Sequence, residues 1–318
     1  MLNIPKFGRF VIYSLFLCTL LTSCSSVASR PADVPYDNEV SKFHEPETTG
    51  SIKSRDVRES SGLTASRCQE NVLWTHNDSD DGPFIFALDP QGRNLGTWKV
   101  TGSENTDWED IAAFKDTDGK CHLLIADTGN NYRKRSTLKI YRVEEPAVTE
   151  QTAETRRRNA LATAPAESFS FSYEDGGQDA ETLLVHPTTG QIYVVSKNIT
   201  SAAGVYKLPP FQAKADQVAR KVGHISVPAV PNGLLTGGEI SPDGRRVAVC
   251  DYFGAYELTL PETAADFDEI WDARAIRFDI GRRAQGEAIT YTADGNTLYA
   301  TSEKRESPIF RVSRVTEE

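Results

Sequence analysis

One pattern of short strands recurs about five times along this 318-residue chain, from residue 52 onward. Each copy has a strand, a short turn, a second strand, and a third strand of alternating aromatic and aliphatic residues. Four of the five first turns contain the Asp, Thr, Pro and Gly residues typical of hairpins. These turns span residues 67–71, 116–120, 187–190, 242–244 and 293–296. The pattern predicts an all-β fold.

The remaining strands of each copy extend this prediction. Second strands are expected at 72–75, 122–126, 192–196, 247–250 and 298–301. Third strands are expected at 84–88, 138–143, 205–208, 255–258 and 309–312. Fourth strands are expected at 95–100, 169–173, 222–227 and 275–280. The fifth copy ends before its own fourth strand, so its sheet lacks one member.

A lone strand-like segment at 52–57 precedes the first copy and has no partner there. If it completes the last sheet, five four-stranded sheets close a ring without open edges. Units of this length with four short strands are the signature of a β-propeller. We therefore predict a five-bladed β-propeller. Six blades remain an alternative, because the insertion at 144–168 can hide further strands, and a two-sheet sandwich is another.

In such a ring each innermost strand starts at the face where its second strand ends. Polar residues at these places in successive blades therefore converge on one mouth of the central channel. The inner strands start with Glu109, Glu181 and Glu287 in three copies. The first copy has Ser61 near this place, and the fourth has Thr236, with Glu239 three residues later.

Acidic residues also stand at most second-strand ends. Crowded carboxylates either take up protons or bind a cation, and Ca²⁺ prefers six to eight oxygen ligands. We therefore predict a Ca²⁺ site, the alternative being acids that only cap strands and face solvent. The predicted ligands are Glu109, Glu181, Glu287, Asp127, Asp251, Glu303 and Asp78.

Other polar or aromatic residues near the mouth are candidates for contact with a ligand: Asn77, Trp108, Lys197 and Arg133. Lys197 is the one basic residue among the second-strand ends, where it forms either a salt bridge or part of an anion pocket. His76 and Lys197 are the catalytic candidates, His76 as a general base. No Gly-x-Ser-x-Gly elbow supports acyl transfer. Whether the chain is an enzyme therefore stays open.

The cysteines fall into two groups. Cys68 and Cys121 lie at the first turns of adjacent copies, so a disulfide between them is plausible if their Cα atoms approach within about 7 Å. Cys250 lies among apolar strand residues and is expected to be a buried thiol. Disulfides persist in oxidising compartments, which makes the N-terminal segment informative.

The first 23 residues have the features of a secretory signal. Lys6 and Arg9 precede an apolar run at 10–21, which is too short for the roughly 20 residues of a membrane-spanning helix. Cys24 directly after Leu-Thr-Ser resembles the bacterial lipobox. This resemblance implies cleavage before Cys24 and a lipid on its sulfur, and Ser25 after it suggests the outer membrane of a Gram-negative cell. An ordinary signal peptide with a chance cysteine is the alternative.

Residues 24–50 are rich in Pro, Ser and acidic residues, so we predict a disordered tether there and a single propeller domain at 51–318. Removing residues 1–23 takes away Lys6 and Arg9 and no acid, which changes the formal charge from −10 to −12. So acidic a chain is a poor nucleic-acid partner. We expect a monomer that meets the membrane through its lipid, with a small anionic ligand or an envelope protein as partner.

Several motifs resemble a family of exported bacterial β-propeller proteins of poorly defined activity, over about residues 58–314. They are Glu59-Ser-Ser-Gly-Leu, Leu73-Trp-Thr-His-Asn-Asp, Asp107-Trp-Glu-Asp-Ile-Ala, Ile125-Ala-Asp-Thr-Gly-Asn-Asn and Gln285-Gly-Glu-Ala-Ile-Thr. The family is more distantly similar to phytase-like and gluconolactonase-like propellers. The resemblance implies a propeller with a divalent cation held over the channel by acids.

Three functions follow as expectations. The first is ligand or partner binding through a cation-binding mouth on a cell-envelope lipoprotein. The second is metal-dependent hydrolysis of phosphate esters or lactones, in which the cation polarises the substrate or activates water. The third is a metal-free scaffold for protein interactions, because fold alone does not dictate function.

Overall fold

The computed structural model describes residues 42–79, 81–211 and 216–315. The predicted signal peptide, Cys24 and most of the predicted tether lie outside these residues. Strands dominate the described part, and its helical segments are the short η1 (Gln151–Glu154), η2 (Arg157–Asn159) and η3 (Phe267–Asp272). The prediction of an all-β fold is confirmed, with several sheets.

The strands pair in antiparallel runs of four, and we call each run a module. Module 1 contains β2 (Ser60–Ala65), β3 (Leu73–Asn77), β4 (Phe84–Leu88) and β5 (Asn94–Lys99). Module 2 contains β6 (Trp108–Lys115), β7 (Cys121–Asp127), β8 (Leu138–Glu144) and β10 (Glu167–Tyr173). Module 3 contains β11 (Ala180–Val185), β12 (Ile192–Ser196), β13 (Ala203–Lys207) and β14 (Asp216–Ile225). Module 4 contains β15 (Gly237–Ile240), β16 (Arg246–Cys250), β17 (Ala255–Thr259) and β18 (Ile276–Phe278). Module 5 contains β19 (Gly286–Tyr291), β20 (Thr297–Ser302), β21 (Pro308–Ser313) and β1 (Glu47–Ser51).

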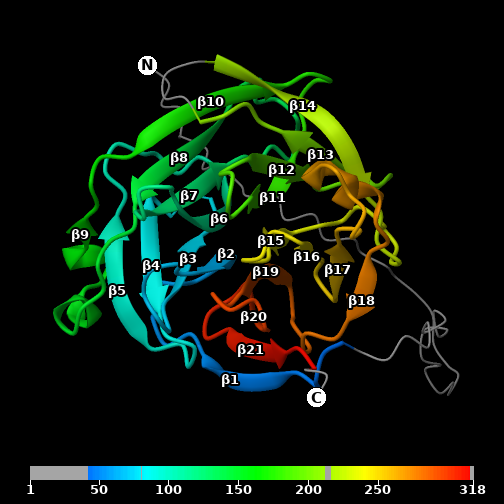
Figure 1. Cartoon of the computed structure of the whole chain (residues 1–318). Coiled ribbons are helices and arrows are strands. Elements are labelled where there is room, and N and C mark those ends of the chain that lie inside the picture. The colour runs from blue at the N-terminus through cyan, green and yellow to red at the C-terminus, as the bar shows by residue number, and fades with distance from the viewer. Residues whose placement is uncertain (1–41, 80, 212–215, 316–318) are drawn as a thin grey trace, which may run out of the picture. The chain divides into compact units, whose positions relative to one another are not determined.

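The first strand of each module lies nearest the centre in Figure 1, and the last strand lies at the periphery. Each of the inner strands β2, β6, β11, β15 and β19 contacts the next, and β19 contacts β2. Five clusters of buried apolar residues fill the five interfaces between successive modules, including the one between modules 5 and 1. The burial of these apolar faces between neighbouring sheets is the main stabilising contribution.

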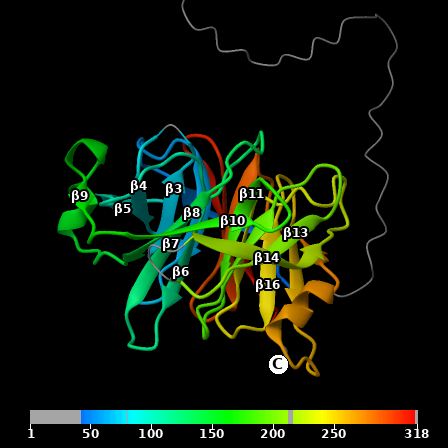
Figure 2. The ribbon, with the colours of Figure 1, turned by 90° about the horizontal axis from the view of Figure 1, so that it is seen from above.

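Two outer connections add to this arrangement. Strand β10 pairs in parallel with β14, which joins modules 2 and 3 into one eight-stranded sheet; Figures 1 and 2 show these two strands side by side. The insertion predicted as a place for hidden strands contains η1, η2 and β9 (Leu161–Ala162). Strand β9 pairs with β5 at the edge of module 1, so the insertion adds no further module.

The strand that completes module 5 differs from the prediction. Residues 52–57 form no strand, and β1, just before them, pairs with β21 instead. Ile52 and Val57 are buried between modules 5 and 1, so their apolar character reflects packing rather than strand pairing. The side chains of β1 are exposed or half-buried, which explains why no hydrophobic alternation marks it.

The predicted tether also extends too far. Phe43 is buried, and its ring stacks on that of Phe278 with centroids 4.3 Å apart. The backbone N–H of His44 donates to the carbonyl of Ser313. Residues from at least Phe43 onward therefore belong to the folded region, and the predicted boundary at residue 51 is corrected.

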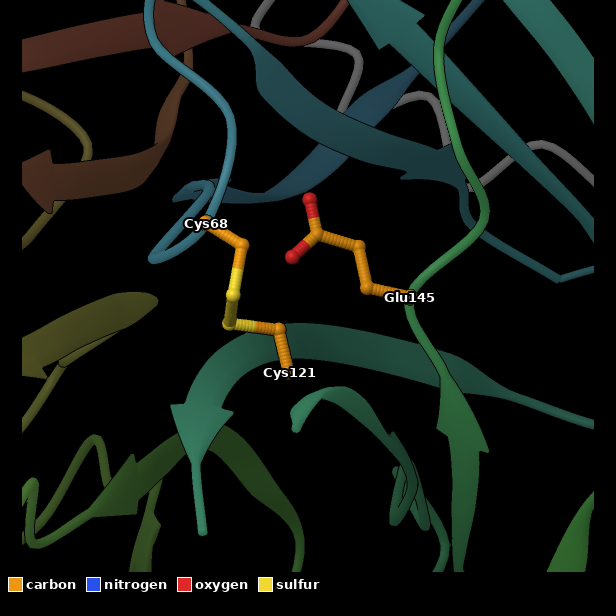
Figure 3. A group of neighbouring side chains, drawn as sticks. All are labelled: Cys68, Cys121 and Glu145. Atoms are coloured by element: carbon orange, nitrogen blue, oxygen red, sulfur yellow. A yellow bond between two sulfur atoms is a disulfide. The ribbon is translucent and has the colours of Figure 1, made fainter. Parts of the chain in front are cut away.

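Modules 1 and 2 are linked by a disulfide between Cys68 and Cys121, whose Cα atoms lie 6.2 Å apart. Figure 3 shows the Glu145 carboxylate pointing toward this disulfide. Its Oε1 accepts hydrogen bonds from Gln69 and the Trp74 indole. Because the two sulfurs are bonded to each other, neither can bind a metal ion, and the contact of Cys68, Cys121 and Glu145 stabilises the fold. Cys250 is a buried free thiol, as expected.

Candidate metal centre

A repeated irregularity in the inner strands positions the predicted glutamates. The pairing register shifts at Glu109 in β6, at Glu181 in β11 and at Glu287 in β19. The same shift occurs between Ser60 and Leu63 in β2. An extra residue in one strand re-aims its side chain, which is how β-bulges commonly shape sites. The three glutamates therefore leave the strand pairing at equivalent places, all at the end of the modules where the inner strands begin.

We call that end the mouth end. Two groups of carboxylates converge there, and within each group the ligand atoms lie within 4.8 Å of one another. One group contains Asp78, Asp107 and Glu109, and the other contains Glu109, Asp179 and Glu181. The groups combine residues from modules 1, 2 and 3, and Glu109 belongs to both. We use the name acidic mouth for these five residues together with Glu287 and Glu303.

Glu109 is the central member of the acidic mouth. Its residue is 5% exposed, and its carboxylate makes no hydrogen bond or salt bridge to another described residue. Burial raises its pKa well above the ordinary value, and the negative charges of Asp78 and Asp107 raise it further. A largely buried carboxylate without donors and beside other acids is stabilised by taking up a proton or by binding a cation.

Gly129, in the loop after β7, leaves the space that these acids occupy. A Cβ atom at this position would lie 2.1 Å from Glu109 Oε1 and 2.4 Å from Asp107 Oδ2. Such distances are far below van der Waals contact, so any larger residue would displace the carboxylates. Asp78 completes this group from the end of β3, and burial raises its pKa to about 6.

Lys197 follows β12 and forms a salt bridge with Glu181. Its positive charge also acts on Asp107, Glu109 and Glu287, and it lowers the pKa of each. The structure therefore places Lys197 inside the cluster, as the sequence predicts. Because the ammonium is already paired, it neutralises one acid rather than serving as a free cation.

Glu287 and Glu303 form a second part of the acidic mouth, on module 5. Burial raises the pKa of Glu287 to about 9, and hydrogen bonding and repulsion from Glu303 contribute to this rise. The Gln285 amide donates to Glu287 at 3.2 Å. Burial raises the pKa of the nearby Tyr252 to about 12, and the charges of Glu287, Glu303, Glu109 and Asp179 add to the shift. The charges of acids from modules 2, 3 and 5 therefore act on the same side chain, that of Tyr252.

Two predicted ligands have other roles. Asp127 Oδ1 accepts hydrogen bonds from the Arg135 guanidinium at 2.7 Å and from the Asp107 backbone at 3.2 Å. Asp251 accepts from two backbone N–H groups of its own loop and from the Tyr256 hydroxyl. Each carboxylate thus already has hydrogen-bond donors, and neither belongs to the two convergent groups. Their role as metal ligands stays a prediction, and we do not count them among the preferred ligands.

The predicted ligand-contacting and catalytic residues are mostly buried. His76 is fully buried, with Nδ1 bonded to the Asn77 carbonyl, and burial lowers its pKa to about 4. The side-chain carbonyl of Asn77 accepts hydrogen bonds from the backbone N–H groups of Arg58 and Glu59. Trp108 is fully buried and donates to the Glu104 carbonyl. These side chains hold the mouth end together and have no surface for a substrate.

Arg133 is exposed on the loop after β7, in a left-handed conformation with φ of 52°. Its neighbour Arg135 is the residue that pairs with Asp127 and lowers the pKa of Asp107. Contact of Arg133 with a ligand stays a prediction, whereas Arg135 is held by its pairing with Asp127.

Asp107 and Asp179 were absent from the predicted ligand set. Both stand two residues before an inner-strand glutamate, so the repeated Asp-x-Glu spacing at 107–109 and 179–181 is the signal that points to them. Glu239, doubtful from the sequence, lies elsewhere on β15. It accepts hydrogen bonds from Thr64, Thr290 and Tyr291 and a salt bridge from Arg67.

Comparison with known proteins adds no family: no model of a protein family matches the chain, and a search of curated proteins finds no match. In the part of the chain that the structure describes, no helix has the length and apolar character needed to cross a membrane. The functional argument therefore depends on the geometry of the acidic mouth.

Proposed function

We propose that the chain is a cell-envelope lipoprotein with a five-bladed β-propeller, whose acidic mouth binds a divalent cation and recognises a ligand or partner. The propeller is supported by the five successive modules and by the cyclic contacts of the inner strands. The core clusters between each pair of neighbouring modules support the same architecture.

The observation that carries the cation site is the carboxylate of Glu109. It is buried, has no hydrogen-bond donor among the described residues, and is shared by both convergent groups. The ligands there are all carboxylate oxygens, which suit Ca²⁺, whereas structural zinc sites are built from Cys and His. Asp78, Asp107 and Glu109 are the preferred ligands, because Lys197 already neutralises Glu181.

Binding is favoured over hydrolysis by the position of the catalytic candidates. His76 is fully buried and bonded to backbone, and Lys197 is paired with Glu181. Neither is available as a general base, so the hydrolase hypothesis lacks a proton acceptor of the predicted kind. Assays with p-nitrophenyl phosphate and simple lactones in the presence of Ca²⁺ should show no turnover above background.

The proposed location in the cell envelope depends on lipidation of Cys24. Export into an oxidising compartment agrees with the Cys68–Cys121 disulfide. Cells grown with radioactive palmitate should label the wild-type chain, and the change Cys24→Ser should abolish the label and release the protein from the membrane fraction. Equal labelling of both forms would refute lipidation at this residue.

The cation site is tested by thermal unfolding in EDTA and after addition of Ca²⁺. A ligand present at a hundred times its dissociation constant stabilises by about 2.7 kcal/mol, which corresponds to a rise in Tm of roughly 5–10 °C for a chain of this size. We expect this rise for the wild type and its loss in Glu109→Gln.

Glu239→Gln is the matched control, since Glu239 is also a buried inner-strand glutamate but already has donors for its oxygens. This variant should melt at a lower temperature and keep the full response to Ca²⁺. A wild type without a response, or a Glu109→Gln variant that keeps it, would overturn the proposed site.

A further inference from the structure

Large apolar side chains are exposed on one end of the modules. Among the described residues, the most exposed large hydrophobics include Val230 at 100%, Tyr132 at 84%, Phe253 at 73% and Ile199 at 69%. All four lie on loops that follow a second strand or lead into an inner strand. The turns at the other end, between first and second strands, present no exposed large hydrophobic within the described residues.

Contacts place these four loops at the mouth end. The loop of Tyr132 donates a hydrogen bond from Asn130 to Asp179 of the acidic mouth. Phe253 follows Tyr252, whose backbone carbonyl accepts a hydrogen bond from the N–H of Gly286, next to Glu287 of the acidic mouth.

The other two loops are joined to each other. Asn198, next to Ile199, forms a backbone bridge with Gly233 in the loop that carries Val230. Asn198 also directly follows Lys197, which pairs with Glu181 of the acidic mouth. We call Tyr132, Ile199, Val230 and Phe253 the apolar rim. Four large exposed apolar side chains on loops at the end that carries the acidic mouth point to an interaction surface there.

The charge of the acidic mouth defines what can fit inside this rim. Its carboxylates outnumber the positive groups near them, which are Lys197 and Arg135. Even with one divalent cation bound, the acids of the mouth outnumber the positive charges beside them. Charge complementarity therefore favours a cationic group.

The excess of negative charge also argues against a membrane as the occupant, because anionic lipid surfaces attract basic rather than acidic groups.

We propose that the mouth end docks a protein segment in which a Lys or Arg side chain enters the acidic mouth and flanking apolar residues contact the apolar rim. This inference deepens the proposed function. It rests on the acidic mouth and not on the bound metal.

A fluorescein-labelled decapeptide of alternating Lys and Leu is the probe, and fluorescence anisotropy with the full chain at low salt is the assay. We expect binding of this peptide, no binding when Glu replaces Lys, and weaker binding when Ser replaces Leu. The combined rim variant changes Tyr132, Ile199, Val230 and Phe253 to Ser. It should bind at least about tenfold more weakly, because a few apolar anchors carry most of the affinity of such a contact.

The control variant changes Leu161 and Val218 to Ser, two exposed apolar residues away from the mouth end. Its affinity should stay within about twofold of the wild type. The proposal is overturned if the wild type does not bind the Lys peptide, if the Glu peptide binds as well, or if rim and control variants are equal. Binding of the rim to phosphatidylglycerol vesicles instead of the peptide would also overturn it.

Calorimetric titration with Ca²⁺ separates this inference from the proposed function. Ca²⁺ binding without peptide binding rejects the docking surface alone. Peptide binding without Ca²⁺ binding rejects the metal site and leaves the docking surface supported.

Discussion

The metal-free protein should lose stability as the pH rises, because Glu287 keeps a proton in the folded state. Burial and the neighbouring Glu303 raise the pKa of Glu287 to about 9, compared with an ordinary value of 4.5. Between these pH values the folded chain holds one more proton than the unfolded chain. Stability from this group is therefore complete below pH 4.5 and is lost as the pH approaches the folded pKa.

The size of the effect follows from the one retained proton. Each pH unit within this window costs about 1.4 kcal/mol of the free energy of unfolding. Between pH 6 and pH 8 the loss is about 2.7 kcal/mol, which lowers Tm by roughly 5–10 °C in a domain of this size. Lys197 and the Gln285 amide oppose the shift of Glu287. Glu109, whose pKa is also raised, adds to the slope, and Asp78, whose pKa is raised to about 6, adds to it mainly below pH 6.

Scanning calorimetry of the full chain in EDTA at pH 5, 6 and 8 measures this slope. Glu287→Gln should remove the Glu287 contribution, because an amide needs no proton and can donate to Glu303. The variant should therefore be more stable than the wild type at pH 8 and similar at pH 5. Glu239→Gln should keep the wild-type slope. A wild-type Tm that is equal at pH 6 and pH 8, or an unchanged slope in Glu287→Gln, would refute the reasoning.

Two further predictions concern Gly129, beside the acidic mouth, and the Cys68–Cys121 disulfide between modules 1 and 2. Gly129→Ala should weaken Ca²⁺ binding at least about tenfold by calorimetry, because its methyl group would displace Glu109 and Asp107; an unchanged affinity would place the cation elsewhere. Replacing both Cys68 and Cys121 by Ala should cost about 2–4 kcal/mol in urea unfolding, because the disulfide closes a loop of 53 residues. The Ca²⁺ response should survive that change, and its loss would mean that the disulfide also shapes the site.

Much of the strand pattern could be predicted from the sequence, because short strands and hairpin turns depend on neighbouring residues. The turn at 242–244, for example, directly precedes β16, as expected. Strand β1 could not be found in this way, since its side chains are exposed or half-buried and it joins β21 from more than two hundred residues away. No local hydrophobic pattern records such a pairing.

The candidate site, too, could be predicted from the sequence only in part. Glu109, Glu181 and Glu287 could be placed from the sequence, because each stands at the start of an inner strand, two residues before an aliphatic residue. The sequence could not show that Asp127 and Asp107 have different partners, although both are acids at the mouth end. The difference is a partner: Arg135 satisfies Asp127, whereas the Asp107 carboxylate lies beside Glu109 and Asp78.

The sequence by itself determined the repeating strands and the spacing that brings acids to one end of successive modules, because both depend on local period and turn chemistry. Only the tertiary structure decided which acids stay without partners, which side chains are closed to solvent, and which strand completes module 5. The reason is that the energy of a buried charge depends on donors and neighbours from other modules, as Glu109 and Glu239 show.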